Sequence, residues 1–270
     1  MEIKRIAIFL PISRKWRINK MLEQIVELEV PEDTTVEIVI LLDNISISKE
    51  SIIAKLKKLG NTKEILEVYN TFNQGTAEGN VARRRQRIAE VFNKAKKFIP
   101  DSTDLVFGIE DDTDISKDAL VTLVGNYNHI SKAYPVGIIS GVQVGRWGFR
   151  MIGAWMFDNI ENPTTAETMP FKSSDDQYPV MQNVDAVGFY CFIVPAHLFK
   201  EIEFRAGDFG PDVYFGLDVR RQGFQNFVNW NVIAGHATKR AVLVPQPDCV
   251  VVKYELHNKK WIRTLPKAKS

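Results

Sequence analysis

Strand-like apolar runs alternate with helix-like segments through the first half of this chain, and no other feature restricts its fold as strongly. The strand-like runs cover residues 6–11, 36–42, 64–69 and 105–109. The segments expected to be helical, from their apolar spacing and stop signals, are 20–30, 49–59, 78–98 and 117–124. Strands that alternate with helices predict a twisted, mainly parallel α/β sheet.

The pattern changes after about residue 135, where helical segments become fewer. Strands are expected at 136–144, 148–157, 184–194 and 227–233, and one helix at 211–223. The segment 163–179, rich in Thr, Ser and Asp, is expected to be a loop and is a candidate lid. We therefore expect one domain over residues 1–258, with a ligand-binding half at 1–134 and a substrate-specific half at 135–258, followed by a basic tail at 259–270.

Composition and charge exclude several classes of protein. Among 270 residues, 35 Lys and Arg balance 33 Asp and Glu, so the net charge gives no argument for a dedicated nucleic-acid-binding protein. The two cysteines, Cys191 and Cys249, exclude a disulfide-dense secreted scaffold. No apolar run approaches the roughly 20 residues of a membrane helix. The chain begins Met-Glu-Ile-Lys and enters a strand-like run without a visible signal peptide, so we expect a cytoplasmic protein.

Four carboxylates lie within residues 110–114, directly after the fourth expected strand. They repel one another, and a hard divalent cation such as Mg²⁺ or Mn²⁺ would relieve that repulsion. In extended backbone alternate side chains share a side, so Glu110, Asp112 and Asp114 would form one face and Asp111 the other. The alternative is a solvated acidic turn ahead of the next helix. The position after a core strand favours the metal site.

Anion-binding candidates stand at the start of the long basic helix. A loop with two glycines, residues 73–80, precedes this helix, whose four arginines are Arg83, Arg84, Arg85 and Arg87. Helix N-termini and arginines both bind phosphate, and we expect Arg84 to do so, while a solvated basic face accounts for most of the others. Asp43, at the end of the second strand, is a candidate partner for a base or ribose, or a simple turn residue. The chain has neither a P-loop nor a Gly-x-Gly-x-x-Gly motif.

The second half adds a candidate base and a candidate metal ligand. Asp212 begins the helix expected at 211–223, where it can take a proton from an acceptor hydroxyl or serve as a first-turn residue. His236 ends a strand-like run, where it can complete a metal shell or only pack.

The order of these motifs carries a resemblance to a known family. Pro11 and Arg14 follow the first strand, Asp43-Asn44 the second, and Glu110-Asp111-Asp112 the fourth. Further on come Gly188-Phe189-Tyr190-Cys191, Pro211-Asp212, Arg221-Gln222-Gly223-Phe224 and Gly235-His236. Over roughly residues 3–240, the chain resembles the GT-A fold nucleotide-sugar glycosyltransferases, family-2-like, with residues 110–112 in the place of the Asp-x-Asp motif.

The resemblance implies a Rossmann-like mixed, mainly parallel sheet flanked by helices, and it implies roles for the matching residues. It implies a nucleotide-sugar site formed by Pro11, Arg14, Asp43, Arg84, Glu110 and Asp111. It implies that Asp112 and His236 bind the metal. Residues 112–114 also spell Asp-x-Asp, which adds Asp114 as a metal ligand. Asp212 is implied as the group that removes the proton from the acceptor. Glu110 departs from the usual first Asp, and Pro211-Asp212 from the Glu-Asp frequent in inverting members, so inversion and retention both stay open.

Together these features predict a Mn²⁺- or Mg²⁺-dependent hexosyltransferase that moves a sugar from a nucleotide-diphosphate sugar, with a UDP-sugar favoured, to an acceptor hydroxyl. The acceptor is open: a glycan, a lipid carrier, a protein or a modified nucleic acid. The basic tail allows peripheral contact with a membrane or nucleic acid, and the alternative is a solvated terminus. Two other functions remain, a Mg²⁺-dependent phosphotransferase or phosphatase using Asp112 and Asp114, and a catalytically inactive nucleotide-binding module.

Overall fold

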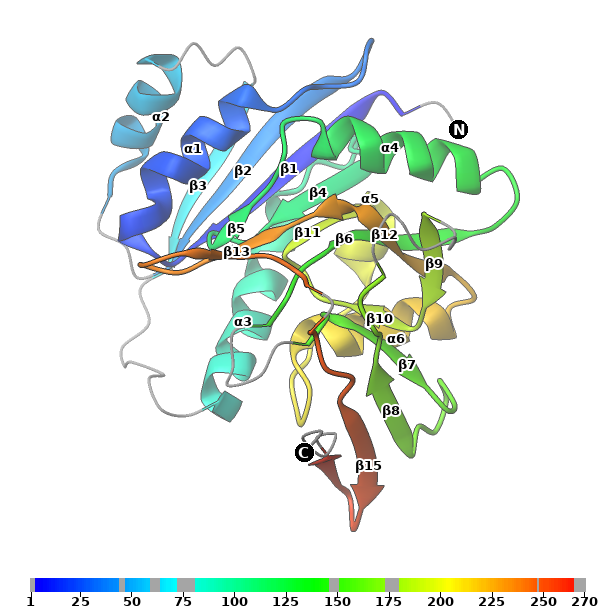
Figure 1. Cartoon of the computed structure of the whole chain (residues 1–270). Helices are drawn as coiled ribbons and strands as arrows, with labels where there is room; N and C mark the ends of the chain where they lie inside the picture. The colour runs from blue at the N-terminus through cyan, green and yellow to red at the C-terminus, as the bar shows by residue number, and fades with distance from the viewer. Residues whose placement is uncertain are drawn as a thin grey trace.

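The computed structural model describes residues 3–43, 47–58, 64–71, 81–145, 151–172, 180–246 and 248–264. Its helices are α1 (Ile18–Glu27), α2 (Lys49–Lys58), α3 (Val81–Ala95), α4 (Ala119–Ile130), α5 (Ala196–Glu201) and α6 (Pro211–Arg221), with short 3-10 turns η1 (Lys15–Arg17) and η2 (Lys96–Phe98). Figure 1 shows these elements along the chain.

A central sheet of eight strands organises the molecule. Its strands are β1 (Arg5–Ile12), β2 (Thr35–Asp43), β3 (Glu64–Thr71), β4 (Leu105–Ile109), β6 (Val136–Val142), β9 (Met181–Val184), β11 (Cys191–Pro195) and β12 (Gln225–Ile233). Their order is β3-β2-β1-β4-β11-β6-β12-β9. Strands β3, β2, β1 and β4 are parallel, β11 is antiparallel to both of its neighbours, and β12 is parallel to β6. The sheet is therefore mixed and mainly parallel, as the alternation of strands and helices predicts.

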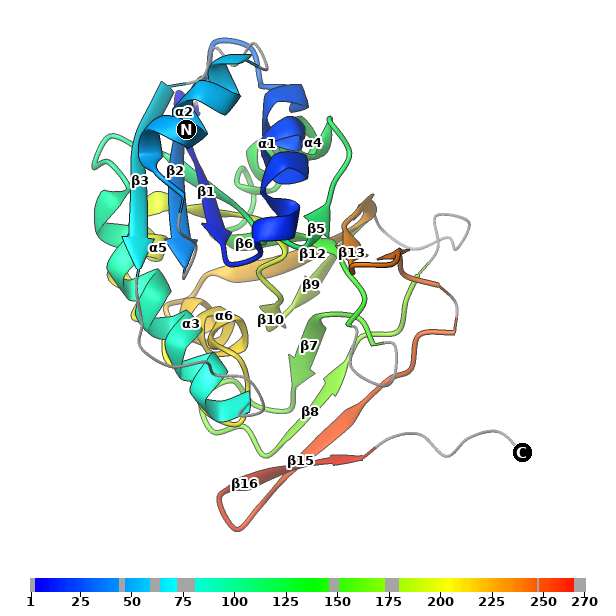
Figure 2. The ribbon, with the colours of Figure 1, turned by 90° about the vertical axis from the view of Figure 1, so that its left-hand side faces the viewer.

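Helices cover both faces of this sheet, because its strands are apolar on both sides. One core cluster joins α1, α2 and α4 to side chains such as Ile8 and Ile40. The other joins α3, α5 and α6 to the alternate side chains, such as Phe9 and Val39. Figure 2 shows the resulting three layers from the side. This arrangement leaves the carboxyl ends of β1, β2 and β4 at one edge of the sheet.

Two smaller sheets complete the fold. A five-stranded sheet has the order β10-β7-β8-β15-β16, and a three-stranded sheet the order β14-β13-β5. Their strands are β5 (Thr113–Asp114), β7 (Ala154–Phe157), β8 (Thr165–Thr168), β10 (Ala186–Val187), β13 (Gly235–Ala237), β14 (Val242–Leu243), β15 (Lys253–His257) and β16 (Lys260–Thr264). The three-stranded sheet joins the acidic segment after β4 to His236.

The strand expected over 184–194 is wrong in detail, because the chain changes sheets there. Strand β9 ends at Val184 in the central sheet, β10 pairs with β7 in the five-stranded sheet, and β11 returns to the central sheet. Asp185 marks the first change, since its carboxylate accepts a hydrogen bond from the Phe157 N–H at 2.8 Å. A continuous apolar pattern does not reveal that its residues serve two sheets.

Two other segments also differ from expectation. The polar segment 163–179 contains strand β8, whose side chains alternate between exposed and buried, so it is not a loop throughout, and its residues 173–179 lie outside the described part. The strand expected at 148–157 is observed only as β7, and residues 146–150 lie outside the described part.

Over its described residues, the C-terminal segment is a hairpin of β15 and β16, where the sequence predicts a basic tail. Its turn residues Asn258 and Lys259 have positive φ angles of 48° and 64°, the geometry of a two-residue type I′ turn. The boundary expected at residue 259 falls in this turn. Among the described helices, none is long and apolar enough to cross a membrane.

Candidate functional site

The acidic segment after β4 is buried at the edge of the central sheet. Asp111, Asp112 and Thr113 are all buried, and a tight turn closes with the Thr113 N–H donating to the Glu110 carbonyl at 3.1 Å. Strand β13 then holds the segment from the other side, because the Ala237 N–H donates to the Asp112 carbonyl at 2.7 Å. The solvated acidic turn considered from the sequence is therefore not what forms.

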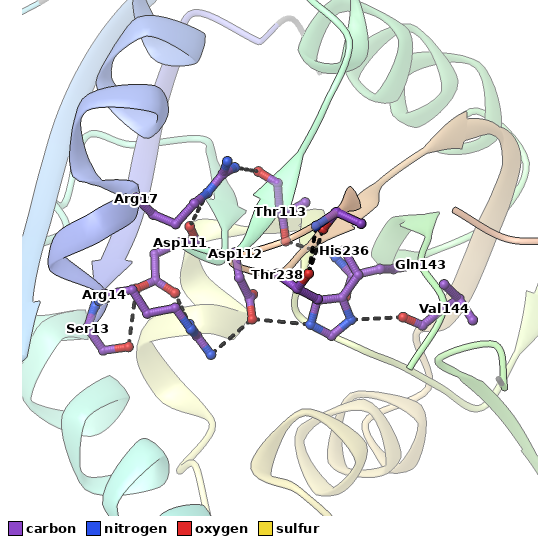
Figure 3. Close-up of polar contacts among 11 residues, drawn as sticks. Ser13, Arg14, Arg17, Asp111, Asp112, Thr113, Gln143, Val144, His236 and Thr238 are labelled. Carbon is purple, nitrogen blue, oxygen red and sulfur yellow. Dashed lines mark hydrogen bonds and ion pairs between the residues drawn. The ribbon is translucent and has the colours of Figure 1, made fainter. Parts of the chain in front are cut away.

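Asp112 and His236 meet at the centre of the site, as Figure 3 shows. Nε2 of His236 lies 3.2 Å from Oδ2 of Asp112, and its Nδ1 lies 2.9 Å from the carbonyl oxygen of Val144. The same Asp112 oxygen lies 2.9 Å from Nη2 of Arg14. Two residues predicted as metal ligands, 124 positions apart in the chain, are thus adjacent.

The hydrogen-bond pattern of His236 tests whether this pair fits a metal ion. A carbonyl oxygen only accepts, so the Val144 contact requires a proton on Nδ1. In the neutral imidazole, Nε2 then presents a lone pair toward the Asp112 carboxylate, which also offers lone pairs. The Arg14 guanidinium lies beside these two acceptors, and a metal ion bound by both of their lone pairs would add a further positive charge. An imidazole nitrogen and a carboxylate oxygen are suitable ligands for Mn²⁺ or Mg²⁺, so the residues fit such an ion.

Asp111 has a different environment from its neighbour. Its Oδ2 accepts hydrogen bonds from the Ser13 N–H at 2.6 Å, the Ser13 hydroxyl at 3.1 Å and the Arg14 N–H at 2.7 Å. Its Oδ1 pairs with Nη1 of Arg14. Asp111 therefore fastens the segment after β1 to the acidic segment, and its predicted contact with the donor stays a prediction.

Asp114 is paired with Arg17, the residue of η1 that precedes α1. The buried Arg17 side chain pairs with the Asp114 carboxylate and donates to the carbonyls of Asp111 at 3.2 Å and Thr113 at 3.3 Å. Gln24 adds bonds to the Thr113 carbonyl and the Ile115 N–H. In the part of the chain that the structure describes, no three His, Cys, Asp or Glu side chains form a ready metal cluster.

Sequence reasoning missed Arg17 and Gln24. Arg17 in η1 and Gln24 on the buried face of α1 are both buried polar side chains, and a buried polar side chain needs partners. Gln24 interrupts the apolar face of α1, between Leu22 and Ile25. This interruption is the one sequence signal that could have identified it.

Asp212 and Glu110 form the second part of the site. Asp212 lies in the first turn of α6, and its Oδ1 lies 2.3 Å from where a Cβ on Gly210 would be, so the carboxylate folds back over that glycine. Burial raises the pKa of Asp212 to about 6, against the N–H groups of Val213 and Asp212 and the charge of Arg85, which lower it. Burial and the charges of Asp112 and Asp212 raise the pKa of Glu110 to about 8. The two carboxyl groups are therefore close enough to influence each other.

The remaining predicted residues lie at the ends of β1 and β2 and on α3. Pro11 is in β1, in register with Leu41 of β2, and Asp43 ends β2. Asp43 pairs with Nη2 of Arg87 at 2.6 Å. Arg84 is half-buried on α3. The Arg87 guanidinium thus forms an ion pair with Asp43, and sequence spacing alone did not distinguish Arg87 from the other arginines of α3.

Comparison with known proteins supports the fold. No family model matches the sequence, and no curated protein matches it. The mannosyltransferase PcManGT from Pyrobaculum calidifontis, solved with GDP-Man and Mn²⁺, has a TM-score of 0.57 at 12% identity, over 89% of this chain and 59% of that one. TarS from S. aureus has a TM-score of 0.50 at 14% identity, over 84% of this chain and 35% of that one.

A197 from STIV also matches, with a TM-score of 0.45 at 14% identity over 92% of each chain. The chain thus spans about 59% and 35% of the two glycosyltransferase structures, and the likeness concerns architecture, because the identities are low. The fold is that of the GT-A-like glycosyltransferases, as the order of motifs predicts.

Proposed function

We propose that this chain is a metal-dependent glycosyltransferase that moves a hexosyl group from a nucleotide-diphosphate sugar to an acceptor hydroxyl. The observation that carries the proposal is the meeting of Asp112 Oδ2 and His236 Nε2 at 3.2 Å, at the carboxyl edge of a GT-A-like sheet. Ligands of open α/β sheets bind at this edge.

Asp112 and His236 would hold the cation, with diphosphate oxygens and water as the other ligands. When bound, Mn²⁺ or Mg²⁺ neutralises charge on the leaving nucleoside diphosphate. The Val144 carbonyl fixes the His236 tautomer, and Gln143 donates to the Thr113 hydroxyl at 3.0 Å beside it. These surrounding bonds orient the ligands.

Asp212 is the proposed base. In a single displacement, the acceptor oxygen attacks the anomeric carbon, the bond to the diphosphate breaks with its electron pair, and Asp212 takes the hydroxyl proton. A base with a pKa of about 6 is mostly ionised at neutral pH and still accepts a proton. Inversion at the anomeric carbon is the product expected of this step, and NMR of the product distinguishes it from retention.

Asp43 and Arg87 are proposed to bind the nucleobase or the ribose of the donor. The other proposed residues of the nucleotide-sugar site are Pro11, Arg14, Arg84, Glu110 and Asp111. The Nε of Arg87 is buried without a hydrogen-bond partner among the described residues, so an acceptor atom on the nucleotide would satisfy it. The sequence favours a UDP-sugar, while PcManGT was solved with GDP-Man, so both donors belong in the test.

The phosphotransferase or phosphatase alternative needs Asp112 and Asp114 to act together. The Asp114 carboxylate is instead paired with Arg17, which supports the transferase over this alternative. Hydrolysis of a simple phosphate ester without any nucleotide sugar would reverse that preference.

The test combines binding and turnover. UDP or GDP with MnCl₂ should stabilise the wild-type protein against heat, and neither the nucleotide nor the metal alone should reproduce the full shift. Asp112→Asn should lose the metal-dependent part of the shift. With a donor and acceptor found by screening, Asp112→Asn and Asp212→Asn should each lower transfer by at least about a hundredfold. Wild-type turnover in both variants would overturn the proposal.

A further inference from the structure

The loop that leads into α6 ends just before the proposed base, Asp212, and an arginine from α3 holds this loop. Nη1 of Arg85 donates to the carbonyl of Gly207 at 3.2 Å and also to the carbonyl of Asp208. Arg85 stands 122 positions before Gly207, on the helix that lies beside α6 (Figure 2). In the sequence, Arg85 is distinguished only as one of four arginines on a basic helix.

The same loop has two other supports. The Asp208 carboxylate accepts a hydrogen bond from the Trp261 N–H of β16 at 3.3 Å. Gly207 lies against Tyr214 of α6, since a Cβ at Gly207 would be 2.7 Å from the Tyr214 hydroxyl. The loop is therefore held by α3, by the C-terminal hairpin and by α6, and Asp212 follows it within one turn.

Arg85 is not needed to dock α3 on this part of the protein. More than two turns further along α3, Asn93 exchanges two hydrogen bonds with the backbone of Phe204, at 2.7 and 2.9 Å. Lys96 donates to the Ile202 carbonyl at 3.1 Å. These bonds secure the helix at residues 202–204, whereas Arg85 is the α3 side chain seen on the carbonyls next to Asp212.

Three titratable groups on different elements interact electrostatically with Asp212. They are Glu110 after β4, Tyr190 before β11 and Arg85 on α3. Burial raises the pKa of Asp212, and Arg85 is the cation that opposes this effect. Loss of Arg85 would therefore change both the place and the charge environment of the carboxylate.

We propose that Arg85 is a positioning residue for the base: by binding the carbonyls of residues 207 and 208, it fixes the loop that places the Asp212 carboxylate opposite Glu110. This inference rests on the proposed function. It assigns to α3 a contribution to the acceptor side of the site, separate from the contact of Arg87 with Asp43 on the nucleotide side.

The test compares Arg85→Met, Arg85→Lys and Asn93→Ala in the full chain. Hydrogen–deuterium exchange should rise about fivefold in the amides of residues 207–213 of Arg85→Met, the factor that loss of one hydrogen bond gives. Arg85→Lys should restore part of the protection. Asn93→Ala should loosen the segment around residue 204 and leave 207–213 unchanged. Equal exchange of residues 207–213 in wild type and Arg85→Met would overturn the proposal.

Turnover gives the second readout. The assay uses UDP-glucose or GDP-mannose with MnCl₂ and measures the release of the nucleoside diphosphate. Arg85→Met should lower kcat by about tenfold to a hundredfold, and its pH midpoint should move upward, while the affinity for UDP or GDP with Mn²⁺ stays within about twofold. An unchanged kcat and midpoint would also contradict the inference. If wild type turns over neither donor and binds neither nucleotide, the proposed function fails, and the exchange result still decides whether Arg85 fixes the loop.

Discussion

Asp111 and Asp112 are adjacent in the chain but have different partners, and this difference separates their roles. The Asp111 carboxylate accepts hydrogen bonds from the backbone N–H groups of Ser13 and Arg14 and pairs with the Arg14 guanidinium. Asp111 therefore holds the loop after β1 in place. Asp112 faces a histidine lone pair and one arginine nitrogen. A cation or a diphosphate can therefore change the surroundings of Asp112 without breaking the loop.

The raised pKa of Asp212 predicts a pH profile. A base must be ionised, and burial raises the pKa of this carboxyl from the usual 3.8 to about 6. Below that value the group is protonated and cannot accept the hydroxyl proton, so kcat/KM should rise with pH through about 6 and then level. Asp212→Asn should remove this inflection. A rate that is flat between about pH 5 and 7.5 in the wild type would rule out Asp212 as the base.

Gly210 offers a substitution that moves the base without disturbing the fold. Its φ and ψ of −72° and 164° suit alanine, but the new Cβ would lie 2.3 Å from Oδ1 of Asp212. The carboxylate must therefore move in Gly210→Ala, and turnover should fall by about tenfold to a hundredfold with a nearly unchanged melting temperature. Turnover equal to wild type would mean that the observed position of Asp212 is not the working one.

At the scale of elements, the contact of β4 with β11 sets how closely the central sheet packs. Gly108 of β4 is in register with Phe192 of β11, and a Cβ on Gly108 would lie 2.2 Å from the Phe192 ring. That ring stacks on Phe189 at 4.4 Å between centroids. An added methyl group at Gly108 therefore has no free space beside the ring.

Two glycine-to-alanine substitutions should have opposite effects on stability. Gly108→Ala should lower the free energy of unfolding by about 1–3 kcal/mol, because the methyl group overpacks the core. Gly125→Ala, on the exposed side of α4 with no atom within 4 Å of the new Cβ, should raise it by about 0.5–1 kcal/mol through helix propensity. Urea unfolding of both variants measures the difference, and equal midpoints would show that the packing at Gly108 is looser than described.

Across the whole molecule, the site joins segments that are distant in sequence. Its polar contacts connect residues 13–17 with 111–114, and 112 with 236. A ligand bound there should stabilise the entire domain, because unfolding any of these segments would remove the site. The site and the fold are therefore expected to be lost together.

Metal removal gives the corresponding measurement. The Mn²⁺ complex of UDP or GDP, at about one hundred times its dissociation constant, should raise the free energy of unfolding by about 2.7 kcal/mol, and EDTA should remove the metal-dependent part of that gain. Asp114→Asn should keep the metal-dependent part, because the Asp114 carboxylate is already paired with Arg17. Loss of the metal effect in Asp114→Asn would instead place this carboxylate among the ligands.

Local patterns determined much of the fold. The runs at 6–11, 36–42 and 105–109 are strands because continuous apolar sequence in a short segment suits a strand buried on both faces. Their alternation with helices determined the parallel arrangement of the first four strands. The place of the acidic segment followed, because a loop after a parallel strand lies at the ligand-binding edge.

Tertiary structure alone decided the pairing of side chains within the site. Periodicity describes one segment at a time, whereas Asp112 and His236, or Arg17 and Asp114, come together only when distant segments pack. The change of sheets at Asp185 could not be predicted from periodicity for the same reason, since one apolar run can contribute strands to two sheets. The sequence by itself determined the first four strands and the edge of the sheet at which the acidic segment lies, and packing determined which arginine or histidine contacts each carboxylate.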